Sequence, residues 1–176
     1  MTADYAFANP HGLYYMIIRP EEPADHSAIR AVVETAFPTP AEARLVDQLR
    51  ADGDAQISLV AIDDGIIVGH VMFSRMAAEF RALGLGPVAV KPARQRSGVG
   101  SLLIRRGLSQ SEAEKWEIVF VLGSPAYYRR FGFDPALASG FTSPYAGPHL
   151  MALSLIQPLP RLSGRIDYAP AFAALG

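Results

Sequence analysis

The residues of this chain that are best suited to chemistry lie in one basic segment around two glycines. The segment from Arg81 to Ser111 contains neither Asp nor Glu, although the formal net charge of the whole chain is only -1. Its basic residues are Arg81, Lys91, Arg94, Arg96, Arg105 and Arg106. Gly98 and Gly100 allow the backbone to approach a ligand closely, and a helix beginning there offers unpaired N–H groups and the positive end of its dipole. This pattern predicts an anion-binding site.

The spacing of the glycines indicates which kind of anion the predicted site binds. The loop lacks the G-x-G-x-x-G spacing of dinucleotide sites, and it lacks the Gly-Lys-Ser/Thr ending with which a P-loop binds a triphosphate and magnesium. We interpret it as a site for a diphosphate held without a metal. The alternative is that Gly98 and Gly100 only form a tight turn between a strand and a helix, with the arginines solvated at the surface.

Composition excludes several other kinds of site. The chain has no cysteine, which excludes disulfides, thiolate metal sites and a cysteine nucleophile. His26 and His149 have no ligand-like neighbours at short spacing, so the scattered histidines predict no metal site. The near-neutral charge gives no strong nucleic-acid signal, and no apolar run approaches the roughly 20 residues of a membrane-spanning helix. We therefore expect a cytoplasmic protein without a membrane or nucleic-acid partner.

The elements that must position the glycines are predicted from hydrophobic periodicity. Leu83 to Val90 is a strand, a helix begins near Gly98, and Trp116 to Leu122 is an apolar run typical of a strand buried on both faces. A short helix over Pro125 to Arg130 follows and ends at Gly132. Elsewhere we predict strands at Tyr15 to Arg19, Leu150 to Ile156 and Arg165 to Tyr168. We predict helices from Pro23 to Phe37 and from Pro40 to Gly53. The strands Ile57 to Ile62 and Ile66 to Phe73 are predicted to form a hairpin around Asp63-Asp64-Gly65.

The chain divides into a short leader and one domain. Residues 1–15 show no clear period, and we interpret them as an N-terminal leader segment. Residues 16–176 contain no repeat, low-complexity tract or linker, which predicts a single domain. The mixture of strands and helices within it indicates an α/β (α+β) protein built on one mixed sheet.

The glycine loop lies in the run Val88-Ala89-Val90-Lys91-Pro92-Ala93-Arg94-Gln95-Arg96-Ser97-Gly98-Val99-Gly100-Ser101-Leu102-Leu103. This run resembles the acetyl-coenzyme A motif of the GNAT superfamily of N-acetyltransferases, whose core pattern is Gln/Arg-x-x-Gly-x-Gly/Ala. The resemblance extends over roughly residues 16–157, and the segment Val121 to Phe133 is similar to a bacterial subgroup of predicted acetyltransferases. It implies a mixed, mostly antiparallel twisted sheet of about six to seven strands, flanked by about four helices and splayed at the fourth and fifth strands.

The resemblance implies that acetyl-coenzyme A, or another short acyl-coenzyme A, is a co-substrate. The amides from Arg96 to Ser101 would hold its pyrophosphate. Val88 to Val90 would pair with its pantetheine arm where their strand splays from the strand Trp116 to Leu122, because N–H and C=O groups at the splay have no neighbouring strand. The implied cofactor-binding residues are Val88, Ala89, Val90, Gln95, Arg96, Ser97, Gly98, Val99, Gly100 and Ser101.

The resemblance also implies a catalytic acid. Tyr128 matches the tyrosine that the family often uses to protonate the departing thiolate, and Tyr127 is the weaker candidate. The alternative is that both tyrosines only pack with Phe131 and Phe133 in an aromatic cluster. The strand Leu83 to Val90 carries no Asp, Glu or His that could act as general base. The candidates for that role are Glu79, His70, Glu42 and a water chain.

Together these features predict an acyl-coenzyme A-dependent N-acyltransferase. It would transfer acetyl to a small-molecule or peptide primary amine by direct attack in a ternary complex, since no cysteine can carry the acyl group. The alternative is a non-catalytic regulatory or sensor module that binds acyl-coenzyme A. The apolar tail with Tyr168, Phe172 and Leu175 predicts either a homodimer contact or packing on the same domain.

Overall fold

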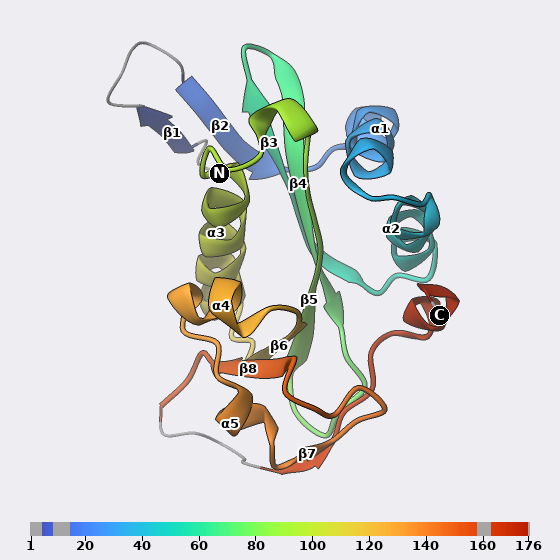
Figure 1. Ribbon diagram of the computed structural model, residues 1–176, viewed down its shortest axis with the longest axis vertical. Helices are drawn as coiled ribbons and strands as arrows, with labels where there is room; N and C mark the ends of the chain where they lie inside the picture. Colours follow the sequence, from blue (N-terminus) through green and yellow to red (C-terminus); the bar gives the residue numbers. More distant parts are fainter. Residues whose placement is uncertain (1–4, 9–14, 158–162, 176) are drawn as a thin grey trace.

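The computed structural model describes residues 5–8, 15–157 and 163–175 of this 176-residue chain. One large sheet runs through it, with helices on both faces (Figure 1). The strands are β1 (Tyr5–Ala8), β2 (Tyr15–Pro20), β3 (Ala55–Asp63), β4 (Ile66–Arg75), β5 (Ala82–Val90), β6 (Ile118–Leu122), β7 (Phe141–Thr142), β8 (Leu150–Ser154) and β9 (Gly164–Arg165). The α-helices are α1 (His26–Ala36), α2 (Ala41–Ala51), α3 (Val99–Ala113), α4 (Pro125–Tyr128) and α5 (Pro135–Ala138). Short 3-10 helices are η1 (Pro23–Asp25), η2 (Pro92–Arg94), η3 (Arg129–Phe131) and η4 (Pro170–Leu175).

The large sheet is mixed and mostly antiparallel. Its strand order is β1-β2-β3-β4-β5-β6-β8, and among these neighbours β5 and β6 form the parallel pair. The β3–β4 hairpin turns through Asp64 and Gly65, whose φ angles of 49° and 74° are both positive. A two-residue turn with this geometry matches the twist of the strands it joins, which is why the Asp-Asp-Gly sequence predicts it.

The parallel pair separates partway along β5. The residues Ala82 to Leu85 pair with Ile118 to Val121, and β5 then continues to Val90 beside β4 alone. The separation begins at Gly86, whose φ of 145° is rarely adopted by other residues, and at Pro87, which has no N–H to donate. Within the described part of the chain, the end of β5 therefore faces no strand on its β6 side.

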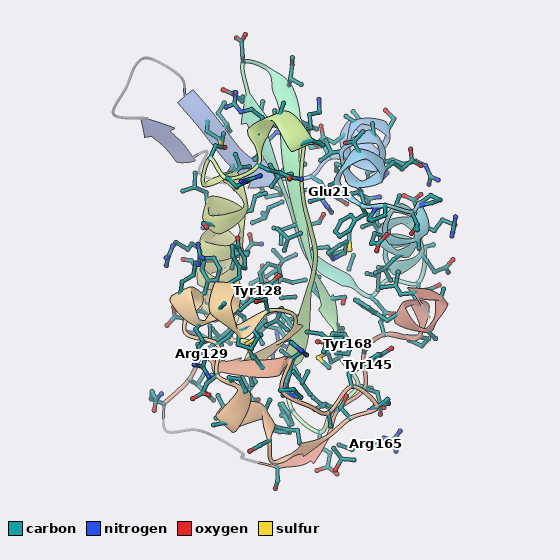
Figure 2. All side chains as sticks on the ribbon, in the orientation of Figure 1. Glu21, Tyr128, Arg129, Tyr145, Arg165 and Tyr168 are labelled. Atoms are coloured by element: carbon teal, nitrogen blue, oxygen red, sulfur yellow. The ribbon has the colours of Figure 1, made fainter. Side chains whose placement is uncertain are left out.

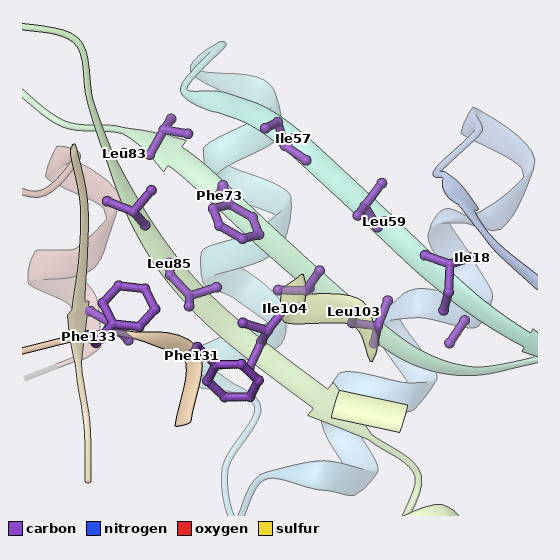
Figure 3. Close-up of a cluster of buried hydrophobic side chains, with 14 of the residues drawn as sticks. Ile18, Ile57, Leu59, Phe73, Leu83, Leu85, Leu103, Ile104, Phe131 and Phe133 are labelled. Carbon is purple, nitrogen blue, oxygen red and sulfur yellow. The ribbon is translucent and has the colours of Figure 1, made fainter. Parts of the chain in front are cut away.

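The helices cover the two faces of the sheet with separate apolar layers. Helix α3 lies on one face, while α1 and α2 lie on the other (Figure 1). The α3 layer contains Phe73, Leu103 and Phe131 among the buried side chains shown in Figure 3, and each fully buried side chain of this size contributes about 1.5–3 kcal/mol. Gly107 is required for this packing, because a Cβ there would lie 2.1 Å from the Phe73 ring. No helix in the described residues is long and apolar enough to cross a membrane.

Most elements lie where the sequence predicts them, with differences near the two ends of the chain. The strand Tyr5–Ala8 forms within the leader segment and pairs with β2, while residues 1–4 and 9–14 of that segment lie outside the described part. The predicted strand Arg165 to Tyr168 is shorter: β9 is Gly164–Arg165, and it pairs with β7 rather than with the large sheet. A strand of two residues is too short to show a periodic pattern, and its pairing partner is distant in sequence.

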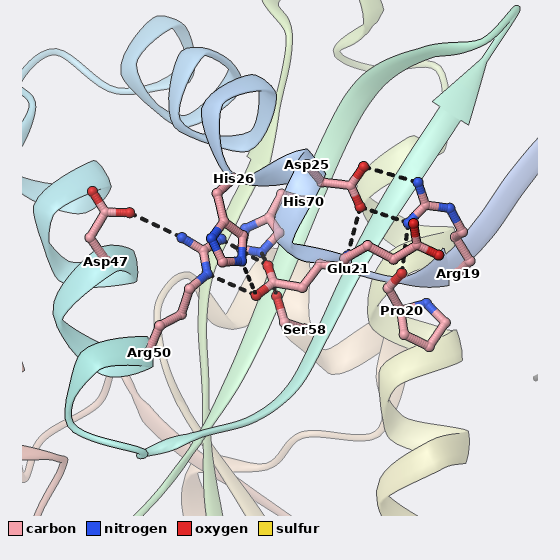
Figure 4. Close-up of polar contacts among 10 residues, drawn as sticks. Arg19, Pro20, Glu21, Asp25, His26, Asp47, Arg50, Ser58 and His70 are labelled. Carbon is pink, nitrogen blue, oxygen red and sulfur yellow. Dashed lines mark hydrogen bonds and ion pairs between the residues drawn. The ribbon is translucent and has the colours of Figure 1, made fainter.

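A polar network of mostly buried side chains joins Glu21, which follows β2, to α2 and the β3–β4 hairpin (Figure 4). Arg50 binds both carboxylate oxygens of Glu21 at 2.8 Å, and Ser58 donates a hydrogen bond of 2.5 Å to the same carboxylate. His70, which is fully buried, lies 2.7 Å from Ser58 and 3.4 Å from Glu21. Burial alone raises the pKa of Glu21, but the hydrogen bonds from Arg50, His70 and Ser58 outweigh it and hold that pKa well below its usual range.

We expect Glu21→Gln to lower the free energy of unfolding by about 3 kcal/mol, because it leaves the mostly buried Arg50 without its bidentate partner. Urea unfolding at neutral pH measures the change. Since the pKa of Glu21 is lowered in the fold, its contribution is complete above the ordinary glutamate pKa of about 4.3 and declines as the pH falls below it. The two proteins should therefore converge in stability in acid.

Glu34→Gln is the matched control, because Glu34 forms an exposed ion pair with Arg30 within α1. It should cost less than about 0.5 kcal/mol. An equal loss for both variants, or a Glu21→Gln difference that does not shrink in acid, would show that the network does not stabilise the fold as described.

Candidate functional site

The loop between β5 and α3 presents free backbone donors. The first hydrogen bond within α3 runs from the N–H of Leu102 to the carbonyl of Gly98 at 3.0 Å. The N–H groups of Val99, Gly100 and Ser101 therefore have no acceptor inside the helix. Gly98, the N-cap residue, has a φ of 92° and contributes no side-chain cap. This end of α3 combines unpaired donors with the positive end of a helix dipole, which suits an anion.

These donors open into a cleft of about 580 Å³, which we call the basic cleft. Three arginines and no acidic residue line it. Its lining residues are Ala36, Phe37, Val88, Val90, Arg94, Gln95, Arg96, Gly98, Gly100, Ser101, Tyr127, Tyr128 and Arg130. The predicted cofactor-binding residues Val88, Val90, Gln95, Arg96, Gly98, Gly100 and Ser101 thus lie together along one surface.

The remaining predicted cofactor residues face elsewhere. The side chains of Ala89 and Val99 are buried in the apolar layers on opposite faces of the sheet, so only their backbone groups could contact a ligand. Ser97 donates its hydroxyl to the carbonyl of Arg94 at 2.5 Å, which stabilises the turn. Gln95 lines the cleft and also supports the turn, because it donates to the carbonyl of Val90 at 3.1 Å. Part of the motif therefore shapes the loop instead of lining the cleft.

The basic segment is divided between the cleft and other parts of the fold. Arg94 lines the cleft and also forms an ion pair with Asp63 of the hairpin. Arg96 lines the cleft from the turn, where its own φ is 58°. Arg81 instead stacks on Trp116 with its guanidinium 4.3 Å from the ring centroid, and it donates to the backbone carbonyls of Glu114 and Lys115. Arg81 is a structural residue of the domain, not part of the cleft.

Arg130 lines the basic cleft although it lies outside the basic segment. Its guanidinium stacks on the Tyr127 ring at 4.5 Å and donates to the Tyr127 carbonyl at 2.9 Å. Sequence reasoning did not assign it a site role. The signal available was its place beside Tyr127 and Tyr128 in the run Tyr127 to Phe133, but only the turn of α4 and η3 brings it over the loop.

A second cavity of about 340 Å³ lies at the separation of β5 and β6, and we call it the apolar cavity. Aliphatic and aromatic side chains form most of its wall, and Glu42 is the single charged residue among those that line it. Its lining residues are Phe37, Glu42, Leu45, Leu85, Gly86, Pro87, Val88, Leu122, Tyr128, Tyr145, Tyr168, Phe172 and Leu175. Phe172 packs against the α1–α2 layer of its own chain, as the same-domain interpretation of the tail predicts.

The basic cleft and the apolar cavity adjoin at the end of β5. Phe37, Val88 and Tyr128 line both of them. These shared residues lie where β5 has separated from β6, so that on this side the backbone of β5 faces no described strand. A ligand that binds in the cleft can therefore extend along β5 toward the cavity, and a second molecule can meet it beside Tyr128.

Tyr128, which is labelled beside α4 in Figure 2, is held at this junction by close packing. A Cβ at residue 123 would lie 2.5 Å from its ring, so Gly123 is needed for the ring to take this place. The Tyr127 and Phe133 rings contact it edge-on at centroid distances of 5.0 and 6.0 Å. Burial, with a smaller effect of Tyr127, raises the pKa of Tyr128 to about 12. Its hydroxyl is therefore protonated at neutral pH, and both the acid role and the aromatic cluster are compatible with its position.

The candidate bases are separated by the fold. Glu42 lines the apolar cavity and accepts a hydrogen bond from the Thr39 hydroxyl at 3.4 Å. His70 is buried in the Glu21 network, where burial lowers its pKa, and it lines neither the basic cleft nor the apolar cavity. Glu79 is exposed and also lines neither. Of the three side chains, Glu42 is the one that lines either of these two cavities.

Comparison with known proteins identifies relatives over most of the chain. A family model described as an acetyltransferase (GNAT) domain matches residues 17–136. Two uncharacterised N-acetyltransferases of Escherichia coli (strain K12), YhbS and YjhQ, are each 38% identical to the chain, over 125 and 133 residues. These alignments cover 69% and 71% of this chain and 75% and 74% of the relatives.

Solved structures give the same result for the fold. The Escherichia coli YhbS structure, a GNAT family N-acetyltransferase in complex with CoA, superposes with a TM-score of 0.88 at 30% identity and covers 96% of this chain and 98% of its own. A GNAT family acetyltransferase from Brucella melitensis in complex with acetyl-CoA superposes with a TM-score of 0.76 at 37% identity, covering 89% and 97%. The observed sheet, which is mixed and splayed at its parallel pair, therefore confirms the predicted architecture.

We expect Gly123→Ala to destabilise the protein by about 1–3 kcal/mol, because the new methyl group overlaps the Tyr128 ring and forces it to move. Urea unfolding measures the cost. In a Tyr128→Ala background the same glycine substitution should cost much less, since the atoms it meets are gone. Equal costs in both backgrounds would mean that Gly123 does not position Tyr128.

Proposed function

The chain belongs to the GNAT acetyltransferase family, and from this we propose that it transfers an acetyl group from acetyl-coenzyme A to a primary amine by direct attack in a ternary complex. One observation carries the proposal. The basic cleft and the apolar cavity meet at Val88 and Tyr128, where β5 leaves β6. Two reactants entering from opposite sides would have their reacting groups side by side at that junction, which is the main requirement of a direct transfer.

The basic cleft suits the nucleotide end of the co-substrate. Its unpaired N–H groups at Val99, Gly100 and Ser101 can donate to a pyrophosphate, and Arg96 and Arg130 add positive charge around it. Gly100 keeps that surface open, because a Cβ there would already lie 3.3 Å from the Tyr127 hydroxyl. These backbone donors and arginine side chains fit a diphosphate.

The end of β5 suits the amide-bearing arm of coenzyme A. Val88 to Val90 pair with β4 on one side and face no described strand on the other. An extended ligand with alternating donors and acceptors can pair with such an edge as an added strand would. In this proposal the thioester lies beside Tyr128, and no side chain of β5 is required to recognise it.

Tyr128 acts in this proposal as a hydrogen-bond donor to the sulfur that leaves. As the C–N bond forms and the C–S bond breaks, the nitrogen loses one proton and the sulfur gains one. A pKa of about 12 makes Tyr128 a weaker acid than a free phenol, so complete transfer of its own proton before the C–S bond breaks is unfavourable. Donation that strengthens as negative charge develops on sulfur fits this environment.

We expect Arg96→Asn to weaken coenzyme A binding about tenfold, because one charge-assisted contact to phosphate is lost while asparagine tolerates the positive φ of this residue. Isothermal titration with coenzyme A measures the change. Arg44→Asn removes an exposed arginine of α2 that lines neither the cleft nor the cavity, and it should leave the affinity within about twofold. An unchanged Arg96→Asn affinity would remove this side of the cleft from the binding site.

We expect Tyr128→Phe to lower kcat about 100-fold while the affinity for coenzyme A stays nearly constant, because the hydroxyl acts at the bond-breaking step and the ring packing is kept. Release of free thiol from acetyl-coenzyme A in the presence of amines gives the rate. Tyr127→Phe should change kcat much less. If turnover of Tyr128→Phe equals that of the parent protein, Tyr128 serves only the aromatic cluster.

A further inference from the structure

The apolar cavity and the basic cleft differ in the charge of the residues that line them. The cleft is lined by three arginines and no acid, whereas the cavity is lined by one carboxylate, Glu42, and by no Lys or Arg. The remaining wall consists of apolar and aromatic side chains, including Phe37, Tyr145 and Phe172. A cavity of this composition favours a cation with an apolar body over an anion.

Glu42 is placed to bind that cation. It lies in the first turn of α2, is half-buried, and accepts one weak hydrogen bond from Thr39 at 3.4 Å, which leaves acceptor capacity on its carboxylate. An ammonium group is a charge-assisted donor to such a carboxylate. Aromatic faces nearby can stabilise the same positive charge, since rings attract cations placed over them.

A second polar group in the wall lacks a partner within the protein. Tyr168 lines the cavity, and its buried hydroxyl has no hydrogen-bond partner among the described residues. Burial raises its pKa, with contributions from Tyr128 and Tyr145, so the hydroxyl is neutral and can donate or accept. A buried hydroxyl without a partner needs an explanation, and a bound ligand that reaches it would supply the missing hydrogen bond.

The packing of Tyr168 fixes the size of the cavity on this side. Its ring lies against β5 so closely that a Cβ at residue 84 would be 2.7 Å away, and Tyr145 and Phe172 contact it at centroid distances of 5.5 and 4.9 Å. The three rings form one wall of a cavity of about 340 Å³. This volume is at the lower end of small-molecule sites, so the body of the ligand must be small.

From this we propose that the acceptor is a small primary amine with a single positive charge and an aromatic or similarly apolar body. Glu42 binds the acceptor as its ammonium ion, which gives up one proton to water before the neutral amine attacks the thioester. The body of the acceptor contacts the rings of Tyr145, Tyr168 and Phe172, and the acceptor carries no carboxylate. The inference rests on the proposed transferase function. Amino acids are disfavoured because the cavity offers no cation for their carboxylate, and polyamines because Glu42 alone cannot balance several charges.

The test compares amines that differ in one property. Phenethylamine and phenylalanine share an aromatic body and differ by the carboxylate, while spermidine is polycationic and a short peptide offers only its α-amine. The full chain is mixed with acetyl-coenzyme A and each amine, and thiol release is measured against the background without amine. We expect kcat/KM for phenethylamine to exceed that of each other amine by at least about tenfold.

The role of Glu42 is tested in the same assay. Glu42→Gln should raise the KM for phenethylamine about tenfold with little change in the KM for acetyl-coenzyme A, because a charged acceptor for the ammonium becomes neutral. Glu112→Gln is the matched control, since Glu112 is an exposed carboxylate on α3 that lines neither the cleft nor the cavity. Its kinetic constants should equal those of the parent chain.

The outcomes separate this inference from the proposed function. Preferred transfer to phenylalanine, spermidine or the peptide overturns the inference and leaves the transferase function in place. An equal phenethylamine KM in Glu42→Gln and Glu112→Gln overturns the role of Glu42. Absence of thiol release with every amine, combined with a normal titration of coenzyme A, overturns both and favours a protein that binds the co-substrate without turning it over.

Discussion

The separation of β5 from β6 after Leu85 is the constraint on which the rest of the structure depends. A parallel pair that stayed together would satisfy the backbone of Val88 to Val90 and close the space between the strands. Because the strands part at Gly86 and Pro87, one backbone edge has no strand partner among the described residues, and two cavities of opposite charge character meet beside it. The proposed ligand contacts, and the place of Tyr128, all follow from that opening.

An opening in a sheet must be held by the packing around it. On one face, α3 lies directly on Phe73 because Gly107 has no side chain, and this fixes the N-terminus of α3 beside the end of β5. On the other face, Glu21 and Arg50 connect the end of β2 to α2, which carries Glu42. The N-terminus of α3 and Glu42, which contact ligands in our proposals, are thus each held in place on their own side of the splay.

The same residue types serve different purposes in different places, and this limits what a motif can reveal. The arginines of the basic segment look equivalent in sequence, yet Arg96 lines the basic cleft while Arg81 stacks on Trp116. Arg130 lies far along the chain but lines the same cleft, because α4 and η3 turn back over the loop. Charge composition indicates that an anion site exists, whereas the backbone path decides which charges reach it.

The sequence by itself determined the order of most elements, the hairpin at Asp64 and Gly65, and the glycine loop at the start of α3, because periodicity and turn residues are local properties of the chain. Only the tertiary structure decided that His70 is buried away from both cavities, that Glu42 faces the apolar cavity, and that β9 pairs with β7. These relations join residues distant in sequence. They depend on how the layers pack, which no local pattern specifies.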